Sequence, residues 1–179
     1  GRVTARMAEA RYALAFASAD LRDASPQAVE GLARARLAEL IINCDLAELG
    51  REMGCQMWVE GPGHVPLDEI EGNIMLEKRM SGKAPYYVLG PLPCDSGAGY
   101  DHITAAIGAA NSARYGADLI CYITPAEHLA LPNESDVREG VRATRLAARI
   151  RDIAKYPDRR EHEKQAAMAR RALPWDAHL

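Results

Sequence analysis

Two histidines and a glutamate stand out in the sequence because they follow short apolar runs that are typical of strands. Glu60 and His64 bracket a Gly-Pro-Gly turn in "WVEGPGHVP", and His128 follows a later run in "ICYITPAEHLALP". Two neutral imidazoles with a carboxylate are a common ligand set for zinc or non-haem iron. Histidines that only hydrogen-bond to a loop backbone would show the same spacing, so the pattern alone leaves both interpretations open.

Further polar residues follow the same apolar runs. Asp95 and His102 come after the run "YYVLG", and Glu127 stands directly before His128. Asp101 also follows that run, and it could be catalytic or only the N-cap of the next helix. These residues are therefore candidates for the same site.

Glu60 and Tyr87 are candidates for contact with a ligand. Glu60 stands beside glycines, where a ligand can approach the backbone closely, although a hydrogen bond to loop amides explains its position equally well. In "APYYVLGP" one of Tyr86 and Tyr87 must face inward, because strand side chains alternate. An inward tyrosine is more often a core residue than a ligand contact.

The periodicity of apolar residues predicts the elements that position these side chains. Helices are predicted at 25–54, 67–82, 103–116 and 134–155, followed by a charged, solvated helix in the tail, and strands are predicted at 55–60, 86–90 and 118–123. Such strict alternation, with strands apolar on both faces, indicates a parallel sheet covered by helices.

An α/β fold of this kind is either a (β/α)8 TIM-type barrel or an open doubly wound sheet. The barrel is favoured because the unusual polar residues all follow strands, and barrel enzymes carry their reactive residues at the carboxyl ends of the strands. Only three strands are legible, whereas a barrel needs eight. The chain is therefore expected to be part of a barrel.

The composition limits the partners. A formal net charge of −3 and a pI near 6.0 provide no basic surface for nucleic acid or an anionic membrane, so we expect a small-molecule substrate. The four cysteines lack C-x-x-C spacing, which argues against a disulfide framework or a zinc ribbon and fits a reducing cytoplasm. No apolar run approaches the roughly 20 residues of a membrane span, and we expect no targeting segment.

Four stretches together resemble the phosphomethylpyrimidine synthase family of radical S-adenosylmethionine (SAM) enzymes: "VEGPGHVPLDEIE", "APYYVLGPLPCD", "GYDHITAAIGAA" and "LICYITPAEHLALPNESDVREGV". The resemblance covers roughly residues 40–155 and implies a (β/α)8 barrel. The expected domains are then a poorly matched N-terminal segment at 1–24, the C-terminal part of the barrel at 25–157, and a helical extension at 158–179.

The resemblance also implies an activity, that of a radical SAM carbon–carbon lyase. The implied substrate is 5-aminoimidazole ribonucleotide, and the implied product is 4-amino-5-hydroxymethyl-2-methylpyrimidine phosphate for thiamine biosynthesis. The implied cofactors are S-adenosylmethionine and a 4Fe-4S cluster, which together supply a 5′-deoxyadenosyl radical. Family members associate as homodimers, and the same is expected here.

Four residues of the chain match functional positions of that family. The resemblance implies that His64 and His128 bind zinc or iron, and that Glu60 and Tyr87 contact the substrate. It names no catalytic residue in this chain. On this interpretation the Gly-Pro-Gly turn places a substrate-binding carboxylate and a metal-binding imidazole on one lip of the barrel.

The sequence departs from the family pattern in three places. It lacks the C-x-x-C-x-x-x-x-C tail that binds the cluster and the upstream "DGLRPG" substrate loop, so an inactive metal- or nucleotide-binding fragment is one expectation. It also reads "CDSGAGYDHI" where thiamine enzymes commonly read "TDIAPGYDHI", with Ala98 in place of a proline. Paralogues in the family convert the same nucleotide to 5-hydroxybenzimidazole, the lower-ligand precursor of anaerobically made cobamides, and this product is the close alternative.

Overall fold

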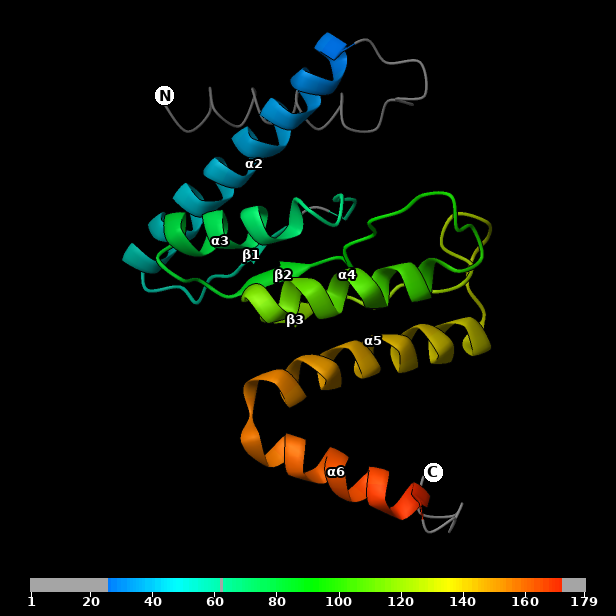
Figure 1. The fold of residues 1–179 in the computed structure, drawn as a ribbon. Coiled ribbons are helices and arrows are strands. Elements are labelled where there is room, and N and C mark those ends of the chain that lie inside the picture. Colours follow the sequence, from blue (N-terminus) through cyan, green and yellow to red (C-terminus); the bar gives the residue numbers. More distant parts are fainter. Residues whose placement is uncertain (1–25, 62, 172–179) are drawn as a thin grey trace.

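The computed structural model describes residues 26–61 and 63–171, in which helices and short strands alternate (Figure 1). The N-terminal segment expected at 1–24 lies outside these residues. The elements are α2 (Pro26–Glu52), β1 (Val59–Glu60), α3 (Ile70–Met80), β2 (Tyr86–Val88), α4 (Asp101–Tyr115), β3 (Leu119–Ile120), α5 (Glu134–Lys155) and α6 (Pro157–Arg171).

The three strands form one parallel sheet in the order β1-β2-β3, as the alternation predicted. Each strand is shorter than its apolar run because regular pairing covers only two or three residues. Backbone bonds nevertheless continue past the strands: the Gly61 amide donates to the Tyr87 carbonyl at 2.7 Å, and the Cys121 amide donates to the Val88 carbonyl at 2.9 Å. The carboxyl ends of the strands are therefore held together beyond the sheet itself.

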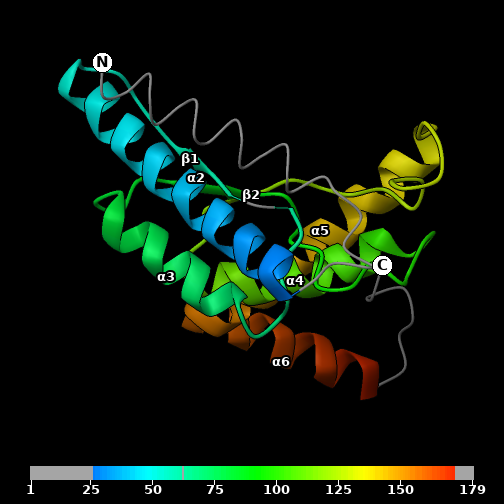
Figure 2. The same ribbon diagram turned by 90° about the horizontal axis from the view of Figure 1, so that it is seen from above.

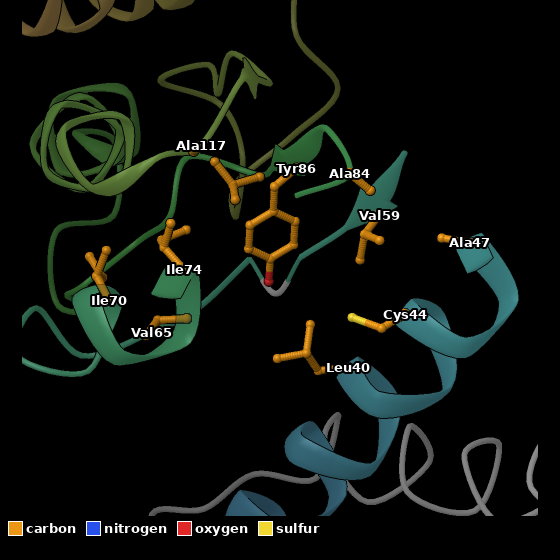
Figure 3. Packing of buried hydrophobic residues seen from close by; sticks show 11 residues of the cluster. Leu40, Cys44, Ala47, Val59, Val65, Ile70, Ile74, Ala84, Tyr86 and Ala117 are labelled. Carbon is orange, nitrogen blue, oxygen red and sulfur yellow. The ribbon is translucent and has the colours of Figure 1, made fainter. Parts of the chain in front are cut away.

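The main hydrophobic core lies between one face of this sheet and the helices α2 and α3. Val59 of β1 and Tyr86 of β2 point toward Leu40 of α2 and Ile74 of α3, and all four side chains are buried (Figure 3). Seen from above, α2 lies over β1 and beside α3 (Figure 2). Burial of these apolar side chains fixes β1 and β2 against the two helices.

The other face of the sheet carries the candidate substrate-binding residues. The register pairs Glu60 with Tyr87 and Tyr87 with Leu119, so these three side chains share one face, opposite Val59 and Tyr86. Leu119 is 45% exposed on this face. Parallel strands in sequential order, with the core helices on one face, are compatible with part of a barrel. Three strands do not close a barrel, so the (β/α)8 fold stays a prediction.

Two helix starts show how the local sequence sets the boundaries. Helix α5 begins as predicted, because Asn133 and Asp136 form a capping box in which each side chain accepts a hydrogen bond from the other residue's backbone amide. The interpretation of Asp101 as an N-cap is wrong. Tyr100 occupies the cap position of α4 without a side-chain bond, and Asp101 is the first helical residue.

The charged tail forms a helix, as predicted. Helix α6 lies against α5 and has no buried residues (Figure 1). An ion pair between Arg149 and Glu163, 2.6 Å apart, joins the two helices. None of the described helices is long and apolar enough to span a membrane.

A buried carboxylate in α3 gives a test of this packing. The Glu77 side chain is fully buried, neither of its oxygens has a hydrogen-bond partner among the described residues, and Lys78 Nζ lies 3.6 Å from Oε2. Burial raises the pKa of Glu77 above its ordinary value of 4.5, and the interactions with Ser81 and Lys78 only partly oppose this. The folded state therefore holds this proton more tightly than the unfolded chain. The contribution of the protonated Glu77 to the free energy of unfolding is complete below pH 4.5, and it is lost as pH rises through the folded pKa of Glu77.

We expect Glu77→Gln to remove this loss of stability and to stabilise the protein by about 1 kcal/mol at neutral pH. Thermal unfolding at several pH values above 4.5 measures the effect. The control is Glu71→Gln, an exposed position in the same helix. Identical pH dependence in the parent chain and in Glu77→Gln would contradict the assignment.

Candidate functional site

The structure brings His64 and His128 together, although 64 positions separate them in the sequence. After the turn that follows β1, the chain pairs again with the loop after β2 through a bridge between His64 and Leu92. His128 lies in the loop between β3 and α5. The two ring centroids are 5.5 Å apart, and the ring planes are inclined at 59°. The sequence interpretation that both imidazoles face one site agrees with this geometry.

Each imidazole is hydrogen-bonded to a carboxylate through its Nδ1 atom. His64 Nδ1 lies 2.7 Å from Asp95 Oδ1, and His128 Nδ1 lies 3.1 Å from Asp101 Oδ1. With Nδ1 donating to the carboxylate, the lone pair of Nε2 is left to bind a metal ion. Carboxylate–histidine pairs of this kind commonly orient metal ligands.

The histidine pair fits a divalent metal ion as a partial ligand set. Zinc and iron both accept imidazole nitrogen, and a catalytic site needs positions left open for water or substrate. Across residues 26–61 and 63–171 there is no group of three or more His, Cys, Asp or Glu side chains placed to hold a metal. The described residues would therefore supply two ligands.

Glu60 and Tyr87 lie next to each other on adjacent strands, on the face opposite the core. Interaction with the Cys121 side chain, with a smaller contribution from burial, raises the pKa of Tyr87 to about 12. Its hydroxyl therefore stays protonated at neutral pH and can donate a hydrogen bond to a ligand. Glu60 is exposed and lines a cavity, so it can accept hydrogen bonds from a polar ligand.

A cavity of about 710 Å³ opens between α2 and β1. Glu60 and His64 line it, whereas Tyr87 and His128 do not. The residues that line it are Arg36, Glu39, Asn43, Leu46, Met57, Trp58, Val59, Glu60, Gly61, Gly63, His64 and Leu89. The volume is sufficient for a small-molecule ligand.

Sequence reasoning missed the contribution of α2 to this cavity. Arg36, Glu39 and Asn43 stand at spacings of three and four, which places them on one face of a helix. That spacing was the available signal, on a face of the helix next to the one that carries the buried residues Leu40, Cys44 and Ala47. Burial, reinforced by the nearby charge of Glu60, raises the pKa of Glu39.

The first glycine of the Gly-Pro-Gly turn is required by packing. A Cβ atom at Gly61 would lie 2.6 Å from the hydroxyl oxygen of Tyr86, which itself donates a hydrogen bond of 2.8 Å to Asn73 Oδ1. No larger residue fits without displacing that buried tyrosine. Gly61 therefore lies close against Tyr86 of β2, directly after Glu60.

The four cysteines do not form a site for an iron–sulfur cluster. Cys44 is buried in the core, Cys121 is partly buried, and Cys55 and Cys94 are exposed. Hydrogen bonding with Ser96 lowers the pKa of the Cys94 thiol, but among the described residues Cys94 belongs to no group of three or more side chains that could hold a metal. A cluster needs several thiolates together, so these residues do not fit it.

Two other sequence candidates form no metal-binding group with the histidine pair among the described residues. Glu127 is exposed in the turn before His128, and its described hydrogen bond is the backbone bond to Thr124. His102 follows Asp101 in α4, and its buried Nδ1 has no hydrogen-bond partner among the described residues. Neither geometry supports a role in binding the metal.

Parallel β/α units with polar side chains gathered after the strands define an α/β protein with an enzyme-like site. The chain belongs to the Radical SAM ThiC family, whose sequence profile matches residues 20–179. The resemblance found in the sequence is thereby confirmed.

Individual relatives are similar over about four-fifths of the chain. Identity is 79% over 143 residues to the 5-hydroxybenzimidazole synthase of Desulforapulum autotrophicum and 72% over 143 residues to that of Geobacter metallireducens. Identity to phosphomethylpyrimidine synthase 1 of Methanosarcina barkeri is 56% over 143 residues. These alignments cover 80%, 79% and 79% of this chain, and 33% of each relative. The chain thus spans about a third of the length of these curated relatives.

Proposed function

We propose that this chain is the metal- and substrate-binding part of a radical SAM enzyme that converts 5-aminoimidazole ribonucleotide to 5-hydroxybenzimidazole. The observation that carries the choice of product is the identity of 79% to a 5-hydroxybenzimidazole synthase, against 56% to a phosphomethylpyrimidine synthase. The family resemblance in the sequence by itself implies the thiamine pyrimidine as the first expectation. The higher identity supports the other product.

The second candidate is synthesis of 4-amino-5-hydroxymethyl-2-methylpyrimidine phosphate from the same nucleotide. The motifs around Glu60, His64, Tyr87 and His128 are compatible with it, and the identity of 56% to a phosphomethylpyrimidine synthase supports it. Both candidates use the same substrate and need the same ligand-binding residues. They differ in the product, which mass spectrometry distinguishes.

In this proposal the two histidines bind the metal, and Glu60 and Tyr87 bind the nucleotide. His64 and His128 would hold one zinc or iron ion, which would supply a positive charge that attracts a polar ligand. Glu60 accepts hydrogen bonds from the nucleotide, and the protonated Tyr87 hydroxyl donates one. The proximity of Glu60 and Tyr87 on adjacent strands supports their assignment to one substrate site.

The remaining cofactors follow from the family. A radical SAM enzyme needs S-adenosylmethionine and an iron–sulfur cluster. The described residues supply no cluster-binding set, so we expect the 179-residue chain by itself to bind metal and nucleotide without turnover. The proposed partner is a second copy of the enzyme, as in the family.

Binding of the nucleotide to the zinc-loaded chain tests the substrate assignment. Glu60→Gln is expected to weaken binding of 5-aminoimidazole ribonucleotide by about 10- to 100-fold, because a hydrogen bond to a charged group contributes roughly 1.5–3 kcal/mol. Tyr87→Phe is expected to weaken it about 5-fold, because a neutral hydrogen bond contributes about 1 kcal/mol. Isothermal titration calorimetry measures both.

The matched control is Glu48→Gln, an exposed glutamate of α2 that does not line the cavity. It should bind the nucleotide as the parent chain does. Parent-like affinity in both Glu60→Gln and Tyr87→Phe would contradict the proposed substrate site.

A further inference from the structure

The two carboxylates that contact the histidine pair differ sharply in their surroundings. The His64 and His128 side chains are similarly exposed, at 42% and 45%. Asp95 is 77% exposed, whereas Asp101 is 1% exposed. Water competes for Asp95 but not for the buried Asp101, so the Asp101–His128 bond, although longer, restrains its imidazole more firmly.

Asp101 is also attached to a more rigid element. It is the first residue of α4, where the positive end of the helix dipole stabilises a carboxylate. Asp95 lies in the irregular loop between β2 and α4. The helix therefore fixes the position of Oδ1 relative to the loop that carries His128.

The second carboxylate oxygen of Asp101 shows that the Asp101–His128 pair lacks a partner within the part of the chain that the structure describes. Oδ2 is buried and has no hydrogen-bond partner among the described residues. A buried carboxylate needs a positive partner, and its contact here is a histidine. A metal ion on Nε2 would make the Nδ1 proton a stronger donor and would bring positive charge near the buried carboxylate.

We propose that Asp101 is a positioning residue for the metal site. It holds His128 in the tautomer that carries the proton on Nδ1 and turns Nε2 toward His64, with Asp95 doing the same for His64 more weakly. The inference rests on the proposed metal site. It goes beyond that site by assigning unequal roles to two carboxylates that do not bind the metal themselves.

The test is zinc affinity of the 179-residue chain, measured at one fixed pH by competition with a coloured chelator. Asp101→Asn should lower the affinity by about 10- to 100-fold, the range typical of removing a partner of a metal-binding histidine. Asp95→Asn should lower it less than Asp101→Asn does. The control is Asp136→Asn, which alters the first turn of α5 and contacts no histidine.

Nitrogen NMR of the imidazoles separates positioning from a purely structural role. In the metal-free parent chain His128 should show a proton on Nδ1, and in folded Asp101→Asn this tautomer should lose its dominance. Circular dichroism checks that each variant is folded. A variant that fails to fold is replaced by Asp101→Glu, which keeps the carboxylate and should recover part of the affinity of the parent chain.

The possible outcomes distinguish the positioning role of Asp101 from the proposed metal site on which it rests. Parent-like zinc affinity and tautomer in Asp101→Asn, with affinity lost in His128→Ala, would overturn the positioning role and leave the metal site in place. No saturable zinc binding by the parent chain would overturn the metal site and the inference with it. Equal losses in Asp95→Asn and Asp101→Asn would overturn the unequal roles.

Discussion

Replacing either His64 or His128 by alanine is expected to lower the zinc affinity of the chain more than any other single substitution. Each variant loses one of the two direct ligands, so the loss should exceed the roughly 10- to 100-fold that accompanies removal of an outer hydrogen-bond partner. The ring separation of 5.5 Å predicts that both variants lose the same site. Chelator competition and zinc content of the purified chain measure the loss.

His162→Ala is the matched control for these variants. This histidine is exposed on α6, where Nδ1 lies 3.2 Å from Arg149, and it takes no part in the proposed site. It should bind zinc as the parent chain does. Loss of zinc in His64→Ala with full binding in His128→Ala would contradict a shared site.

The largest effect on stability is expected for Gly108→Ala. A Cβ atom at this position of α4 would lie 1.8 Å from the carbonyl oxygen of Pro91, a backbone atom that cannot rotate away. Helix α4 would have to move off the segment that follows β2. We expect a loss of about 3 kcal/mol or more in the free energy of unfolding, at the upper end for overpacking. Chemical denaturation measures it.

Gly72→Ala serves as the control for the glycine-to-alanine change. Gly72 lies in α3, and a Cβ atom there would meet nothing within 4 Å. Alanine should therefore stabilise the chain by about 0.5–1 kcal/mol through its higher helix propensity. Equal effects at the two positions would contradict the close contact between α4 and Pro91.

Much of the fold was predictable because local signals agree with the tertiary structure. The periodicity predicts α5 with its observed bounds, and the capping box that Asn133 and Asp136 form in the structure explains its start. The alternation of helices and strands likewise predicts the parallel sheet. The strand lengths were less predictable, because an apolar run shows what can be buried but not how many residues find a hydrogen-bonded partner.

The candidate site was predictable in part. The proximity of His64 to His128 follows from their places after β1 and β3, two strands of one parallel sheet. The bonds to Asp95 and Asp101 depend on loop conformations that no local pattern encodes. Asp101 illustrates this, because an acidic residue before a helical pattern resembles an N-cap, whereas the structure places it inside the helix. Which carboxylate is buried is decided by the packing of α4.

Product formation by a graft tests the proposed function most directly. The 143 matched residues of the Desulforapulum autotrophicum 5-hydroxybenzimidazole synthase would be replaced by those of this chain. The graft would be incubated without oxygen with 5-aminoimidazole ribonucleotide, S-adenosylmethionine and a reductant, with the unmodified relative as reference and a His128→Ala graft as control. Mass spectrometry identifies the product.

We expect 5-hydroxybenzimidazole from the graft and none from its His128→Ala variant. Formation of 4-amino-5-hydroxymethyl-2-methylpyrimidine phosphate instead would contradict the assigned product and support the second candidate. A folded graft that carries its iron–sulfur cluster but converts no nucleotide would contradict the claim that these residues form a working metal- and substrate-binding part of the enzyme.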